Sequence, residues 1–192
     1  MTAPRTSDAG FSLLEVLVSM LLLMAGLLGL AQVFLLGMAH ASTSSANLVA
    51  REKAREAIES VHTARDTRTI TWNQIRNATA RMCEGVDEPG GWNATPGTFI
   101  DGPQVGLRVA GPDGLVNTPG DEDLPLERVR HFGADGIPGT ADDWEQELTN
   151  YSREIWICDH STSLREIRVT IDYRVGGITR QYRLTTFISN YS

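Results

Sequence analysis

The chain has 192 residues, of which 41% are hydrophobic and 21% are charged, and this composition fits one globular domain with an appended segment. Four Trp, five Phe and four Tyr can anchor a core, which excludes a disordered chain. A net charge of −7 argues against a protein whose overall task is to bind nucleic acid or an anionic membrane.

The first predicted element is a helix that has no side facing water. Residues 16–38 are almost wholly apolar, and no Lys, Arg, Asp or Glu occurs between positions 16 and 50. At 1.5 Å per residue, the apolar run makes a helix of about 35 Å, enough to cross a bilayer core of about 30 Å. We therefore expect this helix to lie in lipid or inside an assembly.

Three interpretations of this segment compete. A secretory signal would end at Ala39-His40-Ala41, but the apolar run is longer than the usual signal core. A plain membrane anchor explains the length. It does not explain Glu15, because a carboxylate at the head of an apolar helix costs a few kcal/mol unless it finds a cation.

The third interpretation rests on the sequence Gly10-Phe11-Ser12-Leu13-Leu14-Glu15, which resembles the prepilin motif of type IV pilins and type II secretion pseudopilins. The resemblance is closest to PilV-like minor pilins. It implies that a leader, residues 1–10, is removed between Gly10 and Phe11 and that Phe11 is then N-methylated. It also implies that Glu15 pairs with the α-amino group of a neighbouring Phe11 and so sets the register of assembly.

The next elements belong to a globular head. Residues 11–41 form the membrane-spanning or filament-core helix, and 42–192 form the head. The helix is expected to continue to about residue 65, because Ala50, Ala54, Ala57, Ile58 and Val61 recur at helical spacing. A short second helix is expected at about 71–82, followed by a loop rich in Gly and Pro at 84–104.

An acidic loop is predicted at 111–147, where ten carboxylates face two arginines for a net charge of −8, while the rest of the chain sums to +1. Two segments share the pattern G-x-D-G-[LI]-x-x-T followed by an acidic pair, one starting at Gly111 and one at Gly133. Asp side chains on Gly-supported turns suit Ca²⁺, which takes six to eight oxygens. The alternative is a pair of solvated Asp-Gly turns. The candidate calcium ligands are Asp113, Asp121, Asp123, Asp135, Asp142 and Asp143.

The C-terminal part is predicted to be a β-sheet with strands within 154–188. Residues 165–175 alternate between apolar and polar side chains, and Gly176-Gly177 predicts a tight hairpin turn into 178–188. The expected class is therefore α+β, with a long N-terminal helix on a small antiparallel sheet. The resemblance to pilins implies the same architecture.

Cys83 and Cys158 are the two cysteines of the chain. Because the resemblance places the head outside the cytoplasm, a disulfide is favoured over two unrelated thiols. Closing a loop of about 76 residues would contribute roughly 4 kcal/mol in the chain-entropy model.

The resemblance implies a minor type IV pilin, first an inner-membrane precursor with a single span and then part of a surface pilus, in a tip or priming complex. It would support pilus assembly, adhesion or motility, with its head in the periplasm or outside the cell. Its partners would be prepilin peptidase, the inner-membrane assembly platform and other major and minor pilins, bound through the N-terminal helix, and no nucleic acid.

Three alternatives stay open: a minor pseudopilin of a type II secretion system, a calcium-dependent surface adhesin, and an anchored periplasmic domain that never polymerises. An enzyme is not expected, because the four histidines are scattered outside any recognisable catalytic motif. The one cofactor considered is Ca²⁺.

Overall fold

The computed structural model describes residues 12–191. Its first element is the 54-residue helix α1, Leu13–Asp66, which has an acidic residue in its first turn and Arg65 in its last. No proline interrupts this stretch. The helix ends where Arg68 takes a left-handed backbone conformation (φ 58°) and the amide of Thr69 donates to the carbonyl of Ala64 at 2.9 Å. The chain divides into an N-terminal unit, Met1–Thr43, and a head unit, Ser44–Ser192.

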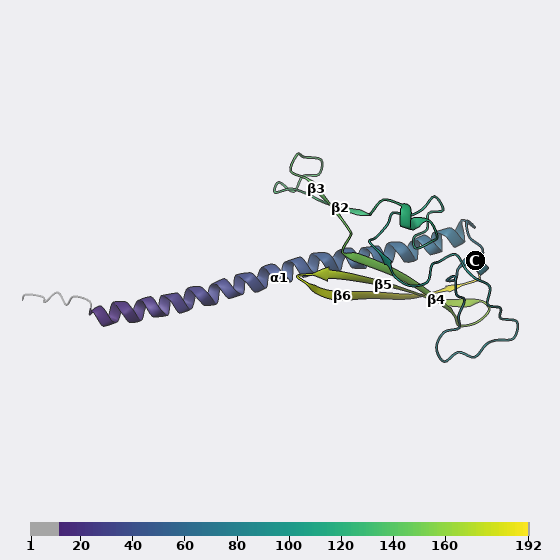
Figure 1. The fold of residues 1–192 in the computed structure, drawn as a ribbon, viewed down its shortest axis with the longest axis horizontal. Helices are drawn as coiled ribbons and strands as arrows, with labels where there is room; N and C mark the ends of the chain where they lie inside the picture. Colours follow the sequence, from purple (N-terminus) through teal and green to yellow (C-terminus); the bar gives the residue numbers. More distant parts are fainter. Residues whose placement is uncertain (1–11, 192) are drawn as a thin grey trace, which may run out of the picture. The chain divides into compact units, whose positions relative to one another are not determined.

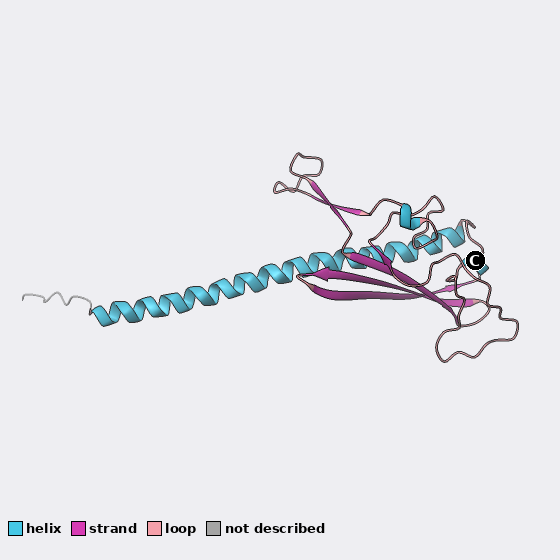
Figure 2. Cartoon of the chain, viewed as in Figure 1, coloured by secondary structure: helices cyan, strands magenta, loops and turns pink. Residues whose placement is uncertain are grey.

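Four antiparallel strands form the main sheet of the head, in the order β1-β4-β5-β6 (Figures 1 and 2). The strands are β1 (Gln104–Val105), β4 (Tyr151–Asp159), β5 (Leu164–Val175) and β6 (Ile178–Ser189). Gly176 and Gly177 make the β5–β6 turn with φ of 58° and 80°, values that favour glycine at both positions. The predicted hairpin is therefore present, and the α+β class is confirmed.

The core lies between this sheet and the part of α1 that belongs to the head. The helix contributes a stripe of small side chains, Ala50, Ala54, Ala57, Val61 and Ala64, all at most 5% exposed. The inward residues of β5, namely Ile167, Val169, Ile171 and Tyr173, are buried on the other side. The predicted alternation along β5 is thus confirmed, with the one difference that Thr170 on the outer face is also buried.

A second, two-stranded sheet joins β2 (Arg128–His131) to β3 (Trp144–Glu147), and Figure 1 shows it apart from the main sheet. We call residues 128–147 the arm. The arm occupies the second half of the stretch predicted as an acidic loop, and a 3₁₀ turn, η2 (Asp121–Asp123), lies in the first half. This stretch is therefore more ordered than a plain loop.

The helix predicted at 71–82 is wrong. Only a 3₁₀ turn, η1 (Trp72–Gln74), forms there. Asn77 explains why, because its side-chain amide donates to the carbonyl of Ile155 at 2.8 Å and accepts from the amide of Ile157 at 2.7 Å. The Asn77 side chain thus forms the hydrogen bonds that a neighbouring strand would make with the backbone of β4. These contacts with a distant strand override the local helical pattern.

Candidate functional site

The N-terminal half of α1 presents its apolar side chains to the surroundings. From Leu13 to Met38 the large apolar side chains are 46–79% exposed. Among the described residues, α1 is the one helix long and apolar enough to cross a membrane. A surface of this size is covered by lipid or by other subunits in a working protein.

Glu15 lies in the first turn of this apolar segment and is exposed. It borders a strip formed by Val16, Met20, Leu23 and other side chains of the same helix face. The hydroxyl of Ser19 donates to the backbone carbonyl of Glu15 at 2.7 Å. Ser19 therefore binds the backbone of Glu15 and not its carboxylate. The predicted cleavage residues Gly10 and Phe11 lie outside the described part of the chain.

The first acidic repeat, residues 111–123, folds into a loop held by its own side chains. The Asp113 carboxylate accepts the amide of Leu115 at 3.0 Å, and Asp121 accepts the amide of Thr118 at 2.8 Å. The Thr118 hydroxyl donates to both carboxylates, at 3.4 Å and 3.1 Å. A Cβ atom at Gly111 would stand 2.9 Å from an oxygen of each, so the first glycine of the pattern leaves room for the two aspartates.

The second repeat, residues 133–143, repeats this geometry at the tip of the arm. Asp135 accepts the amide of Ile137 at 2.9 Å, and the Thr140 hydroxyl donates to Asp142 at 2.7 Å. Asp143 accepts the amide of Gly139 at 2.7 Å. These hydrogen bonds lower the pKa of Asp142, chiefly through Thr140, and the pKa of Asp143, chiefly through the Gly139 amide.

The structure brings the candidate calcium ligands together in pairs rather than in larger groups. Asp113 meets Asp121, and Asp135 meets Asp142, each pair around a threonine hydroxyl, while Asp123 is exposed. Within the described residues, the one group of three potential ligand atoms closer than 4.8 Å to one another is Cys83, His160 and Glu166. Cys83 is disulfide-bonded to Cys158, so its sulfur is no thiolate ligand. Calcium binding by the aspartates stays a prediction.

A buried charged centre next to the disulfide was not foreseen from the sequence. Asp159, fully buried, accepts from Arg76 at 2.9 Å, from the indole of Trp92 at 2.8 Å, and from Arg165. Arg165 also donates to the carbonyl of Ile75 at 3.1 Å. Burial lowers the pKa of Arg165 despite the Asp159 carboxylate. Through Arg76 and Trp92, this buried centre binds the segment that follows η1 to strands β4 and β5.

A second buried cluster holds the first repeat against the sheet. Arg153 donates to the side chain of Asn117 at 2.7 Å and to Glu127 at 3.0 Å, and the Asn117 amide donates to the carbonyl of Arg153 at 2.7 Å. Glu127 also pairs with Lys53 of α1 at 2.8 Å. Burial alone lowers the pKa of Lys53, but the hydrogen bonds to Glu127 and Glu56 outweigh it, so this pKa lies above its ordinary value.

The alternation of residues along β4 and β5 indicates one arginine of each buried cluster. Arg153 and Arg165 occupy positions on the inward-facing side of β4 and β5, in step with Ile155 and Ile167. An arginine at an inward position requires a buried carboxylate or carbonyl groups to receive it. An arginine at an inward position of a predicted strand is therefore expected to be buried and to stabilise the fold.

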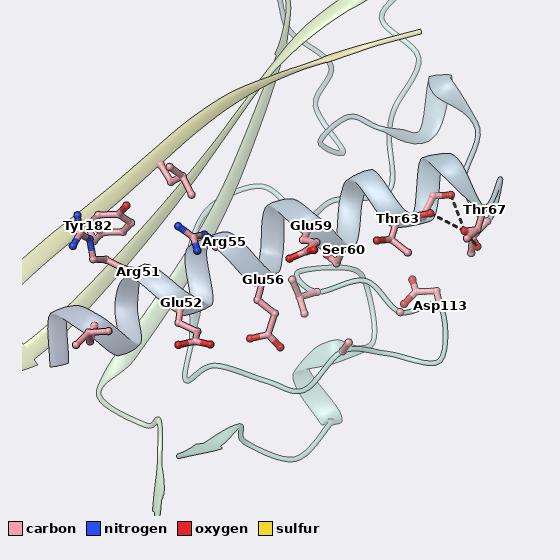
Figure 3. A pocket seen from close by; sticks show the side chains of 17 residues that line it. Arg51, Glu52, Arg55, Glu56, Glu59, Ser60, Thr63, Thr67, Asp113 and Tyr182 are labelled. Carbon is pink, nitrogen blue, oxygen red and sulfur yellow. Dashed lines mark hydrogen bonds between the residues drawn. The ribbon is translucent and has the colours of Figure 1, made fainter. Parts of the chain in front are cut away.

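A groove of about 870 Å³ runs along α1 between β6 and the first repeat (Figure 3). Arg51 and Arg55 lie on the side near Tyr182, and Glu52 and Glu56 point away from that strand. The guanidinium of Arg51 is 5.6 Å from the centre of the Tyr182 ring. The groove offers charged side chains of both signs to the solvent.

Comparison with known proteins finds one match. Residues 5–31 match the family model of the prokaryotic N-terminal methylation motif, which supports a type IV pilin-like family and points to a pilin or pseudopilin. Members of this kind are structural subunits, processed by a prepilin peptidase and assembled with other pilins. No curated protein and no solved structure matches the chain.

Proposed function

We propose that the chain is a minor type IV pilin. The precursor would be held in the inner membrane by residues 11–41, cleaved between Gly10 and Phe11, and passed by the assembly platform into a pilus, in a complex near its tip. The head unit would then stand on the outside, where it supports assembly, adhesion or motility. Its role is structural.

The observation that carries this proposal is the position of Glu15. The carboxylate lies in the first turn of a helix whose large apolar side chains are all exposed from Leu13 to Met38, five residues after the glycine of the methylation motif. A charge inside a bilayer costs about 3 kcal/mol even at moderate estimates. A cation supplied by the new N-terminus of a neighbouring subunit removes this cost and gives the carboxylate a use in assembly.

The proposal is tested by the mass and N-terminal sequence of the native protein, isolated from membranes and from sheared surface fibres. We expect a chain that begins with methylated Phe11 in both fractions. A chain starting at Ser42 would mean a secreted protein, and an intact chain from Met1 would mean a bare anchor; either result contradicts the proposal. Processed chain confined to the periplasm would favour a pseudopilin.

A matched pair of variants tests the role of Glu15. Glu15→Gln keeps the shape of the side chain and removes its charge, so we expect normal cleavage and at least a tenfold loss from the fibre fraction. Ser19→Ala, one turn further along the same face, is the control and is expected to assemble normally. Normal assembly of Glu15→Gln would remove the proposed pairing.

A further inference from the structure

Four side chains that carry metal-binding atoms meet at one end of the main sheet. Cys158, near the end of β4, is the cross-strand partner of Glu166 near the start of β5. His160 lies in the turn between these strands, and the disulfide joins Cys83 to Cys158. One ligand atom each from Cys83, His160 and Glu166 lie within 4.8 Å of one another. Thiolate, imidazole and carboxylate are the groups that bind zinc in proteins.

The histidine and the glutamate already have the separation of two zinc ligands. Nε2 of His160 and Oε2 of Glu166 are 3.3 Å apart. Ligand atoms at about 2.1 Å from a tetrahedral zinc ion lie about 3.4 Å from each other. The other carboxylate oxygen, Oε1, accepts a hydrogen bond from Arg168 at 2.6 Å. Arg168 therefore orients the carboxylate and leaves Oε2 for a metal, as the hydrogen-bond partners of metal ligands commonly do.

Backbone contacts hold the two cysteines together independently of the sulfur–sulfur bond. The Cys83 amide donates to the carbonyl of Asp159 at 3.0 Å, and the Asp159 amide donates to the carbonyl of Arg81 at 2.9 Å. The Asp159 carboxylate is itself held by Arg76 and Arg165. Because none of these contacts uses a sulfur atom, we expect a reduced head to keep its two thiols side by side.

The cluster is buried on the side of the cysteines and open to solvent at the histidine. Cys83 and Cys158 are buried, whereas the side chain of His160 is 30% exposed. The His160 ring packs against Phe187, with the ring centres 5.3 Å apart. An ion can therefore reach the cluster past His160, and its sulfur ligands are then shielded from water.

We propose that the reduced head binds one Zn²⁺ ion at this cluster, through Cys83, Cys158, His160 and Glu166. Both thiols lose their protons on binding, which completes a tetrahedral set of two sulfurs, one nitrogen and one oxygen. The cysteines are thiols when the chain is made, so the site is available before the disulfide forms. Zinc and the disulfide are then alternative cross-links between the same two segments. This inference goes beyond the proposed function and does not depend on it.

The change from the zinc site to the disulfide is a two-electron oxidation. A small-molecule disulfide takes two electrons from the two cysteine thiolates, its own sulfur–sulfur bond breaks to give two thiolates, and the Cys83–Cys158 bond forms. Zn²⁺ leaves with its charge unchanged, because a disulfide sulfur is no thiolate ligand. Since a thiolate bound to zinc is not free to attack the oxidant, zinc should slow the formation of the disulfide.

The test uses the full chain in detergent, either reduced with a phosphine or left oxidised, and titrated with Co²⁺ as a spectroscopic probe for zinc. We expect the reduced chain to show thiolate-to-cobalt charge transfer and the visible bands of tetrahedral Co²⁺, at one ion per chain. Zn²⁺ should displace the cobalt and remove both signals. The oxidised chain should show neither, and it also measures any metal held by the aspartates of the repeats.

Substitutions at the two ligands that are not cysteines separate this site from simple binding by thiols. His160→Gln and Glu166→Gln should each weaken cobalt binding at least about tenfold, the loss that even a partner of a metal ligand causes. His131→Gln and Glu147→Gln make the same changes in the arm and should leave binding unchanged. Alkylation of free thiols followed by mass spectrometry should show that zinc slows oxidation by oxidised glutathione.

A reduced, folded chain that binds no cobalt would overturn the inference. Cobalt binding that survives His160→Gln combined with Glu166→Gln would also overturn it, and would leave the two thiolates as the ligands. If reduction abolishes the near-ultraviolet circular dichroism of the chain, Zn²⁺ should restore it, and failure to do so is a third contrary result. None of these outcomes bears on cleavage at Gly10 or on assembly, so the proposed function is tested separately.

Discussion

The two acidic repeats have the same sequence pattern and share an Asp–amide turn and a threonine hydroxyl that donates to two carboxylates, yet they lie in opposite environments. In the first repeat, Leu115 is fully buried and Asp121 is 2% exposed. In the second, Ile137 occupies the position of Leu115 and is 57% exposed. Asn117 and Gly139 are also equivalent and both left-handed, with φ of 60° and 90°. Only Asn117 is bonded to the sheet, through Arg153.

The difference shows that the pattern encodes the turn and not its surroundings. Gly, Asp and Thr at fixed spacing are enough to form the loop, because each aspartate accepts amides of its own segment. What attaches the first loop to the head is a buried side chain and one polar anchor. The second loop has neither and stays at the tip of the arm.

Truncation of the apolar residue of each repeat, Leu115 or Ile137, should give the largest difference in the free energy of unfolding between the two repeats. Leu115→Ala is expected to lower the free energy of unfolding by about 3 kcal/mol, because it leaves a cavity in the core. Ile137→Ala should change it by less than about 0.5 kcal/mol. Thermal unfolding of the full chain in detergent, followed by near-ultraviolet circular dichroism, measures both. Equal losses would show that the arm is packed and not exposed.

Exchange of the residues at the equivalent positions 117 and 139 should give the second-largest effect on stability. Asn117→Gly leaves the buried Arg153 without one acceptor and one donor, so we expect a loss of about 2 kcal/mol. Gly139→Asn places the anchor residue in the arm, where a Cβ atom would meet nothing within 4 Å but the left-handed backbone (φ 90°) is strained for a side chain, so we expect a loss smaller than that of Asn117→Gly. A strongly destabilised Gly139→Asn variant, measured in the same unfolding assay, would contradict the equivalence of the two positions.

Calcium would distinguish the repeats further. Asp135 and Asp142 of the second repeat are exposed, whereas Asp121 is 2% exposed, and we expect the ion to bind at the second repeat after the loop brings its aspartates closer together. Calorimetric titration should give heat that Asp135→Asn with Asp142→Asn removes and that Asp113→Asn with Asp123→Asn retains. No heat and no thermal shift at millimolar calcium would remove the prediction.

Acid should produce the smallest effect, and in the arm it should act only at low pH. The pKa values of Asp142 and Asp143 are lowered from 3.8 in the folded loop. Their hydrogen bonds therefore stabilise the loop above that value and are lost as the pH falls through the lowered pKa values. The amide resonances of Gly133 and Gly139 should report midpoints below 3.8. A midpoint above 3.8 would exclude these bonds.

Periodic elements were predictable from the sequence because each has a repeating apolar signal. The helix stripe from Ala50 to Val61 and the alternation along β5 both follow from the position of apolar side chains, and Gly176-Gly177 marks the turn between β5 and β6. The motif around Glu15 was readable for a different reason, since a charge in an apolar helix stands out without any structure.

Irregular segments were not predictable, because their conformation depends on distant partners. The conformation of Asn77 depends on its hydrogen bonds to β4. Arg76 depends in the same way on Asp159, which lies 83 positions further along the chain and accepts its hydrogen bond. Such pairings leave no local pattern. The position of Arg165 among inward apolar residues was the one available sign, and it indicates burial without naming the partner.

The disulfide has a mechanical consequence. It joins positions 75 residues apart, Cys83 and Cys158, the second of which lies in β4. When a force pulls on the two ends of the chain, tension passes through the sulfur–sulfur bond and bypasses everything between the cysteines, including both repeats and the arm. The bypassed segment has a contour length of about 250 Å. The oxidised chain is therefore much less extensible than the reduced one, and its arm stays folded under load.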